Sequence, residues 1–402
     1  MKWEKVKLGE LYEVHNGLSK AGKFFGEGYP FLTFSTVFNN YFIPKQITDL
    51  VQSTEKEQES YSIRRGDVFV TRTSETSDEL GMSCVALKDY PMATYNGFTK
   101  RMRPITNRVF PEYIGYYMRL PSFRGEFRAF STMTTRASLR NEDLLGLEVK
   151  LPSIEIQKQI ADILSAYDDL IENNQKKIKL LEEAAQRLYK EWFVDLRFPG
   201  HENTKIVDGI PEGWQWCKVR DVADINSSAL PKNYKEDFID YVDLGSVRCG
   251  HIETRTRYNL NEAPGRAKRC AKDGDIIWGM VRPNLKAYAL VTNPKETDVF
   301  STGFAVLSAK KVPYSYLYCA VTQEEFVGYL VNATNGAAYP AVKPVHFEVA
   351  DILKPDDKIL EQFHGVADLI FRKIEMLDKQ NHNLSEARDL LLPKLMNGEA
   401  EM

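Results

Sequence analysis

The chain has 402 residues, 43% of them hydrophobic and 27% charged, so it is long enough to form two or three globular domains. Its net charge of -3 at pH 7 excludes a uniformly basic surface, which is the simplest signature of a protein that binds a polyanion. No apolar run reaches membrane-spanning length, and residues 1–7 mix charged with apolar side chains, so we expect a cytoplasmic protein without a membrane segment. The five cysteines are too dispersed for a disulfide framework or a thiolate metal site, and we expect reduced thiols.

Residues 1–150 predict a first domain that mixes short strands with helices. Residues 68–70 are β-branched or aromatic and follow the turn Gly66-Asp67, which predicts a strand, whereas residues 111–119 start with proline and predict a helix. Residues 101–140 carry eight arginines against two glutamates, a local balance of +6. Because arginine binds both phosphates and base edges, this segment favours DNA as a partner in spite of the net charge.

Residues 151–199 predict one long helix. Apolar or small residues recur in steps of four and three from Ile156 to Trp192, which marks a single face of a coiled-coil-like helix. Ser153 is a candidate cap, and a helix over residues 154–192 would span roughly 58 Å at about 1.5 Å per residue. Asn174 interrupts the apolar row, and it either fixes the register through a partner across a helix seam or is a tolerated polar residue.

Residues 200–353 repeat the first domain. Trp3 and Val6 align with Trp214 and Cys217, the Gly-Asp turn at 66–67 aligns with 274–275, and Asn-Gly-Phe at 96–98 aligns with Thr-Gly-Phe at 302–304. The order is kept throughout, which indicates two copies of one domain with different loops. Strands are predicted at 276–278 and 305–307, a helix is predicted at 313–320, and residues 248–286 have a local balance of +5.

Residues 354–402 predict a second long helix, whose apolar row from Ile359 to Leu395 matches the first at a constant offset. Asp356 is a candidate cap, and Pro393 is expected to end or kink the helix before Asn397-Gly398. Neither apolar stripe is stable alone in water, so we predict antiparallel pairing, with one domain at each end and an approximate two-fold axis. The predicted pairing residues are Ile160, Ile163, Tyr167, Asn174, Leu181, Leu188, Phe363, Val366, Ile370, Leu377, Leu384 and Leu391.

Candidate DNA-contacting residues lie in the two basic segments and in three pairs of matching loops. These pairs are 17–23 with 227–235, 71–74 with 281–284, and 131–136 with 334–339. Arg72 leaves the strand after the first Gly-Asp turn and Arg282 leaves the strand after the second, so we expect them at matching places. The full set is Lys20, Arg72, Thr73, Arg101, Arg103, Thr135, Arg136, Lys232, Arg255, Arg257, Arg266, Arg269, Arg282, Asn284, Asn335 and Tyr339. In contrast to the domain segments, residues 351–402 have a local balance of -4.

The sequence lacks the common catalytic motifs. It contains no G-x-x-x-x-G-K-[ST] phosphate loop, no G-x-G-x-x-G after a strand, no H-E-x-x-H and no G-x-S-x-G, and its six histidines show no metal-ligand spacing. We therefore predict no catalytic residue, no metal and no cofactor. Overall, the pattern predicts a mixed α/β (α+β) protein with two similar domains and two long helices.

Two strings carry a family resemblance. Residues 188–200 (LYKEWFVDLRFPG) and 390–399 (LLLPKLMNGE), together with the repeat and the helices, resemble the specificity subunit of Type I restriction-modification systems over essentially the full chain. The resemblance implies target-recognition domains at 1–150 and 200–353, and central and distal conserved helices at 151–199 and 354–402. It implies that each domain reads one half of an asymmetric bipartite site in double-stranded DNA, and that the helices set the spacing.

The same resemblance implies a non-catalytic subunit. Its helices would bind two methyltransferase subunits, which recruit restriction subunits, and S-adenosylmethionine, ATP and Mg²⁺ would belong to those partners. Two alternatives remain open, a single-chain methyltransferase or nuclease and a coiled-coil scaffold that binds no DNA. The missing motifs argue against the first alternative. Selection from a randomised duplex pool would test the second, because a scaffold that binds no DNA would enrich no gapped motif.

Overall fold

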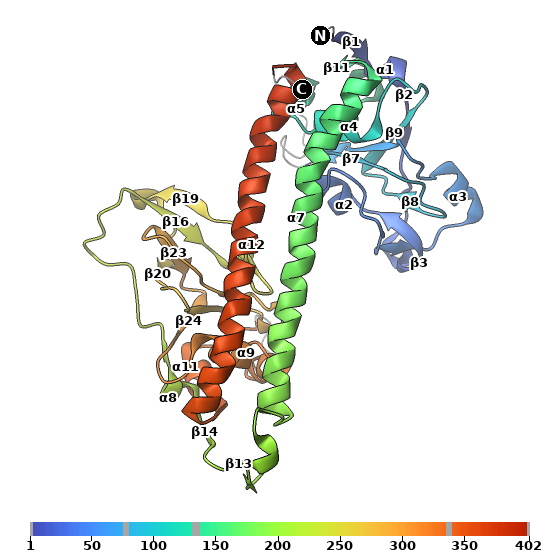
Figure 1. Ribbon diagram of the computed structural model, residues 1–402. Coiled ribbons are helices and arrows are strands. Elements are labelled where there is room, and N and C mark those ends of the chain that lie inside the picture. Colours follow the sequence, from blue (N-terminus) through green and yellow to red (C-terminus); the bar gives the residue numbers. More distant parts are fainter. Residues whose placement is uncertain (1–2, 75–79, 131–136, 335–339, 400–402) are drawn as a thin grey trace. The chain divides into compact units, whose positions relative to one another are not determined.

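The computed structural model describes residues 3–74, 80–130, 137–334 and 340–399 (Figure 1). The chain folds as two compact units, each of which mixes short strands with helices, as predicted. Unit 1 consists of Met1–Glu172 and Asn381–Met402, and unit 2 consists of Asn173–Gln380. Unit 1 therefore contains both ends of the chain.

Unit 1 is built on a four-stranded antiparallel sheet in the order β2-β9-β5-β7. These strands are β2 (Tyr12–Asn16), β9 (Thr99–Pro104), β5 (Val68–Thr71) and β7 (Ser83–Val85). A second sheet places β3 (Phe25–Leu32) between β4 (Leu50–Val51), which is antiparallel to it, and β8 (Thr94–Tyr95), which is parallel. Two further pairs are β1 (Glu4–Lys7) with β11 (Glu148–Leu151), and β6 (Thr73–Ser74) with β10 (Ala137–Ser138).

Unit 2 repeats this topology, which confirms the internal repeat. Its main sheet has the order β15-β24-β21-β22, made of β15 (Ala223–Ile225), β24 (Phe304–Ala309), β21 (Ile276–Gly279) and β22 (Tyr288–Leu290). In its second sheet β16 (Phe238–Val242) again lies between an antiparallel strand, β19 (Thr256–Asn259), and a parallel one, β23 (Asp298–Ser301), with β20 (Ala267–Arg269) added at the edge. The remaining pairs are β14 (Gln215–Lys218) with β25 (Asp351–Lys354), β12 (Ile206–Val207) with β13 (Ile210–Pro211), and β17 (Val247–Arg248) with β18 (His251–Ile252).

Short helices cover the sheets. Unit 1 has α1 (Leu8–Leu11), α2 (Phe34–Asn39), α3 (Glu55–Ser60), α4 (Pro111–Tyr117), α5 (Pro121–Phe130) and α6 (Asn141–Gly146). Unit 2 has α8 (Val219–Val222), α9 (Tyr314–Val321), α10 (Glu324–Asn332) and α11 (Pro344–Glu348). Helices α4 and α9 confirm the two helices predicted beside the prolines at 111 and 313, and strands β5, β21 and β24 confirm the strands predicted after the turns.

Two long helices contribute to both units, α7 (Ile154–Tyr189) with 36 residues and α12 (Asp357–Asn397) with 41. Both predicted caps are present, because Ser153 Oγ accepts a hydrogen bond from the Ile156 N–H at 3.5 Å and Asp356 Oδ1 accepts one from the Ile359 N–H at 3.0 Å. Of the two outcomes expected at Pro393, an end or a kink, the end is wrong: α12 continues through Pro393 to Asn397. Pro393 lies between residues that the core of unit 1 buries, so packing stabilises this turn although proline removes one helical hydrogen bond.

The ends of both helices are defined by special backbone. A π-helical turn over Lys190–Val194 follows α7, and Gly200 beyond it has a φ of +89°. At the end of α12, Gly398 has a φ of +70°; its N–H donates to the Leu395 carbonyl at 3.2 Å and the Glu399 N–H donates to the Lys394 carbonyl at 2.9 Å. This pair of bonds is the left-handed cap that glycine favours. In the part of the chain that the structure describes, neither of these helices nor any shorter one has the length and apolar character to span a bilayer.

The two helices run antiparallel within each unit, as predicted. In unit 1, Ile160 and Leu164 near the start of α7 share a core with Leu392 and Leu395 near the end of α12. In unit 2, residues near the end of α7 share a core with residues near the start of α12, among them Ala185, Tyr189, Phe363 and Ala367. Each core therefore contains one part of each helix.

Most of the predicted pairing residues are at least partly buried. Ile160, Asn174, Phe363 and Leu377 are buried, and Ile163, Tyr167, Leu181, Leu188, Ile370, Leu384 and Leu391 are intermediate. Val366 is the exception, since it is 46% exposed and the next residue, Ala367, is buried instead. The amide of Asn174 donates to Gln380 Oε1 at 3.2 Å, so in unit 2 this buried asparagine has a partner on the other helix.

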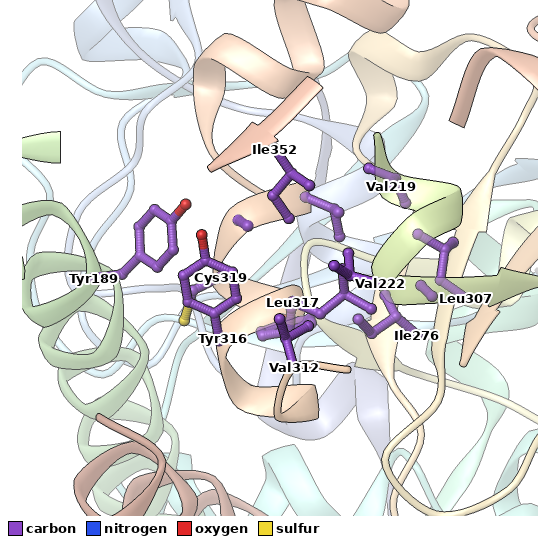
Figure 2. Close-up of a cluster of buried hydrophobic side chains, with 14 of the residues drawn as sticks. Tyr189, Val219, Val222, Ile276, Leu307, Val312, Tyr316, Leu317, Cys319 and Ile352 are labelled. Atoms are coloured by element: carbon purple, nitrogen blue, oxygen red, sulfur yellow. The ribbon is translucent and has the colours of Figure 1, made fainter. Parts of the chain in front are cut away.

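Aromatic rings attach the sheet of unit 2 to the long helices. Figure 2 shows Tyr189 of α7 beside Tyr316 of α9, with Val222, Ile276 and Leu307 deeper in the same core. The Tyr189 and Tyr316 ring centroids are 5.5 Å apart. Beyond Tyr189, Phe193 lies 4.8 Å from Tyr316 and 5.0 Å from Phe363 between ring centroids. The segment at 188–200, which carries part of the family resemblance, therefore packs helix α7 onto unit 2.

Candidate nucleic-acid interface

In unit 1, the loops singled out in the sequence meet where β5 ends. The Arg72 N–H donates to the Phe98 carbonyl at 3.0 Å, and the Leu139 N–H donates to the Arg72 carbonyl at 3.0 Å. The Arg72 guanidinium donates to Asn16 Oδ1 at 3.3 Å. Thr73, in β6, pairs along the backbone with Ser138. Segments from four distant parts of the chain thus converge around Arg72.

Lys20 lies in the same region but is bound within unit 1. Its ammonium is 2.8 Å from Glu57 Oε2 and donates to the Gln52 carbonyl at 2.6 Å. It also lies 5.2 Å from the centre of the Phe24 ring. The hydrogen bond from Lys20 lowers the pKa of the Glu57 carboxyl. These contacts indicate that Lys20 holds its loop in place, which limits its availability to a ligand.

Unit 2 reproduces the backbone arrangement around Arg72 at a different residue. The Met280 N–H donates to the Gly303 carbonyl at 2.9 Å, and the Val342 N–H donates to the Met280 carbonyl at 2.9 Å. Met280 is therefore the structural equivalent of Arg72, and the expectation that Arg282 matches Arg72 is corrected. Arg282 lies two residues further along. Counted without gaps from the glycine of each Gly-Asp turn, Arg72 and Met280 are both six residues on, whereas Arg282 is eight residues on. Its N–H donates to the Pro340 carbonyl at 2.8 Å, so it still lies beside the chain that follows residues 335–339.

The loop at 282–286 presents several side chains to solvent. Arg282, Asn284 and Leu285 are exposed, and Leu285 is 59% exposed. Between Arg282 and Lys286, the residues Pro283–Leu285 form a short 3-10 turn. The Lys286 ammonium is 2.5 Å from Glu324 Oε1 of α10. A guanidinium and an amide on one exposed loop are the side-chain types that recognise guanine and adenine.

The other basic residues predicted in unit 2 fall into two groups. Arg257 forms a bidentate pair with Asp240 at 2.9 and 3.1 Å, which lowers the pKa of that carboxyl, and Arg255 lies 3.3 Å from Asp298. Their charges are balanced by carboxylates. Lys232 and Arg266 are exposed on other segments, and Arg269 is half-buried in β20.

Arg101 and Arg103 point into unit 1, which revises their predicted role. Arg101 is 3% exposed and its guanidinium donates to the Ser62 carbonyl at 2.8 Å. Arg103 binds the fully buried carboxylate of Asp67 through bonds of 2.8 and 2.6 Å, which raise the pKa of its guanidinium. Arg119 donates to the carbonyls of Ser83, Val37 and Asn40. Much of the local balance of +6 therefore serves the interior of unit 1.

Four predicted residues lie outside the described part of the chain, namely Thr135, Arg136, Asn335 and Tyr339. The structure also adds residues that the sequence reasoning missed. Asn16 holds the Arg72 guanidinium, and Phe98 beside it is 57% exposed. Asn16 directly precedes the predicted loop at 17–23, and this position in the sequence could have identified it as a candidate.

A second kind of surface lies on the long helices. Several large apolar residues there are exposed, Leu170 and Leu390 in unit 1 and Leu180, Leu369 and Met376 in unit 2. On the surface of a monomer such residues are tolerated singly, whereas a contiguous group of them marks a protein interface. The sequence analysis expected partner subunits on these helices but named only residues of the seam between them.

In unit 2, the turn between β17 and β18 contacts both long helices through His251. Its Nε2 lies 3.1 Å from Glu182 of α7, and its Nδ1 lies 3.7 Å from Asp378 of α12. Hydrogen bonds to Asp378 and Glu182 raise the pKa of the imidazole to about 10. His251 is therefore a cation at neutral pH and links this hairpin to both helices.

Within the described ranges, no three His, Cys, Asp or Glu side chains are grouped so that they could hold a metal ion. Burial raises the pKa of the Cys84 thiol to about 12, so this cysteine is a poor nucleophile.

Comparisons with known proteins point in the same direction. Residues 1–183 match the model of the Type I restriction modification DNA specificity domain. The chain is 27% identical over 411 residues to the Type I restriction enzyme MjaIX specificity subunit of Methanocaldococcus jannaschii, covering 99% of this chain and 93% of the relative. It is 22% identical over 470 residues to the HindI specificity subunit of Haemophilus influenzae, covering 99% of each. The crystal structure of the S subunit of a Type-I restriction-modification system from M. genitalium has the same fold, with a TM-score of 0.58 and 15% identity over 100% of this chain and 97% of that one.

Proposed function

We propose, from the chain's membership of the Type I restriction-modification specificity-subunit family, that it reads an asymmetric bipartite site in double-stranded DNA, one half with each unit. The observation that carries the proposal is that both units have the same strand topology but carry different residues where the equivalent strands β5 and β21 end. The same strand order supports Arg72 and Asn16 in unit 1, but Met280 and the longer loop at 282–286 in unit 2. Because one scaffold presents different side chains, the two half-sites should differ in sequence.

We assign the two target-recognition domains to residues 1–150 and 200–353, and the helical connectors to residues 151–199 and 354–402. The connectors set the unread gap between the half-sites, because α7 and α12 are continuous and each unit contains a part of both. Their exposed apolar residues form the docking surface for two methyltransferase subunits. Restriction subunits join through the methyltransferase, and the assembly works in the cytoplasm.

This subunit supplies no catalytic residue in the proposal. Methyl transfer, with base flipping and S-adenosylmethionine, belongs to the methyltransferase, and ATP and Mg²⁺ belong to the partners. Among the candidate DNA contacts, Arg72, Arg282 and Asn284 have the strongest support, because they lie at or beside the loops that converge at the ends of β5 and β21. Arg101 and Arg103 are left out of the interface.

Methylome sequencing tests the proposal directly. Expression of this chain with its methyltransferase in a host that lacks the system should methylate a single gapped motif with two different half-sites. Arg72→Ala should relax selection in one half-site, and Arg282→Ala should relax it in the other. An ungapped motif, or identical effects of the two substitutions, would show that the units do not read separate halves.

A further inference from the structure

The loop at 282–286 is held in an unusual backbone conformation. Arg282 has a φ of +50° and Lys286 a φ of +53°, and neither is glycine. A side chain in this left-handed region costs on the order of 1–3 kcal/mol, and Arg282 also precedes a proline, which favours extended backbone at that position. Two such residues flank one three-residue turn. Strain of this kind persists only where the surrounding structure determines it.

The surroundings do fix this loop. Its first residue is bonded through the Arg282 N–H to the Pro340 carbonyl at 2.8 Å. Its last residue accepts a bond from the Cys249 N–H at 3.0 Å, and the Lys286 side chain pairs with Glu324. Pro283 is buried. The chain is therefore tied on three sides, while the tip of the loop remains exposed.

The exposed tip of the loop carries an apolar side chain, although an exposed position in a polar loop usually carries a side chain that hydrogen-bonds with water. Leu285 is 59% exposed, and its neighbours Arg282 and Asn284 are exposed and polar. Leu285 is thus left exposed in a turn whose two ends are held by backbone hydrogen bonds. Proteins that bend DNA place Leu, Phe, Ile or Met in this way and insert the side chain between two base pairs.

We propose that Leu285 is a wedge that enters the DNA stack and unstacks one base step in the half-site read by unit 2. Arg282 and Asn284 bind the adjacent base edges or phosphates and hold the loop against the groove. The rigid, strained turn allows insertion without a loss of loop entropy on binding. In unit 1 the chain passes from Arg72 into β6, and the residues that follow β6, 75–79, lie outside the described part of the chain. The inference rests on the proposed DNA-reading function.

The test uses the full chain in complex with its methyltransferase and a duplex that contains the gapped motif. 2-Aminopurine is placed at one position after another in the unit 2 half-site, because its fluorescence rises when it loses stacking. We expect a rise at the wedge step in addition to the rise at the adenine that the methyltransferase flips. Leu285→Ala should abolish the first rise and keep the second, with about a ten-fold fall in affinity, the scale of one lost base-pair contact. Leu285→Met, which keeps a long apolar side chain, should retain both.

Ile206→Ala is the matched control, since Ile206 is also an exposed apolar residue of unit 2 but lies in β12. It should leave both signals unchanged. The wedge proposal is overturned if the wild-type complex binds the gapped duplex and the 2-aminopurine fluorescence rises only at the flipped adenine. In that case the proposed function still stands. The same holds if Leu285→Ala leaves the wedge signal in place. Failure of the wild-type complex to prefer any gapped duplex overturns both proposals.

Discussion

Shortening both long helices by one heptad should shorten the unread gap of the DNA site. The windows are residues 173–179 of α7 and 379–385 of α12, which remove seven residues from each antiparallel partner and preserve their mutual register. They spare the ion pair between Asp168 and Arg388 in unit 1 and the contacts of His251 with Glu182 and Asp378 in unit 2. Both anchoring points therefore remain in the shortened protein.

The expected shift follows from helix and DNA geometry. Seven residues at about 1.5 Å each remove roughly 10.5 Å, which corresponds to about three base pairs at ~3.4 Å per step. Seven residues also make nearly two whole turns, with a deviation of about 20°, so the apolar seam continues to face its partner. We expect unchanged half-sites and a gap that is about three base pairs shorter.

The assay is methylation of a plasmid library in which the two half-sites are fixed and the gap varies. A seven-residue deletion from α7 alone breaks the register and should abolish methylation. Asn174→Leu combined with Gln380→Leu removes the buried polar pair without any change in length, and it should leave the gap unaltered. Methylation at the original gap by the doubly shortened chain would refute the view that the helices set the spacing.

Three further predictions concern stability. Phe363→Ala removes a fully buried ring that contacts several aromatic neighbours and should lower the free energy of unfolding by about 3–5 kcal/mol in urea titrations followed by tryptophan fluorescence; a loss below about 1 kcal/mol would contradict this packing. The pKa of the His251 imidazole is raised to about 10, so its contribution to the free energy of unfolding is complete below its ordinary pKa near 6.5 and is lost as the pH rises through 10. The difference in unfolding free energy between wild type and His251→Gln should therefore shrink from pH 6 to pH 10. Growth of that difference would be inconsistent with the ion pairs. Arg103→Ala leaves the Asp67 carboxylate buried without its partner and should destabilise the chain by about 3–5 kcal/mol, while the methylated motif stays the same. As a control, Arg266→Ala on the surface should change the free energy of unfolding by less than about 0.5 kcal/mol.

The parts of the fold that were predictable are those with long periodic patterns. The apolar rows of α7 and α12 extend over ten turns each, and Ser153 and Asp356 precede them with side chains that cap helices, so the helices and their starts follow from local chemistry. The sequence did not show that the helix continues past Pro393, because a proline penalty is local, whereas the burial of the last turn of α12 depends on residues 1–172.

The binding surface was less predictable, because the sequence shows the type of a side chain but not its direction. Arg101 and Arg103 lie two apart on β9 and therefore face the same way, and that face happens to be the one that covers Ser62 and the buried Asp67. Arg282 and Lys286 adopt the left-handed backbone conformation although neither is glycine, and the amino-acid sequence of the loop did not predict this conformation. The equivalence of Met280 with Arg72 follows from equal spacing after Gly66 and Gly274, and the prediction missed it because it paired arginine with arginine.

The composition of unit 1 determines when it can fold during synthesis. Its core includes Leu392, Leu395 and Met396, which are translated after unit 2, together with Val6 and Leu8, which are translated before it. Multidomain chains usually fold from the N-terminus as each domain leaves the ribosome. Here unit 2, formed by Asn173–Gln380, leaves the ribosome complete while the first unit still lacks its final helix turns. Unit 1 is therefore begun first and finished last, and a message truncated within the last part of α12 yields a protein in which only unit 2 is whole.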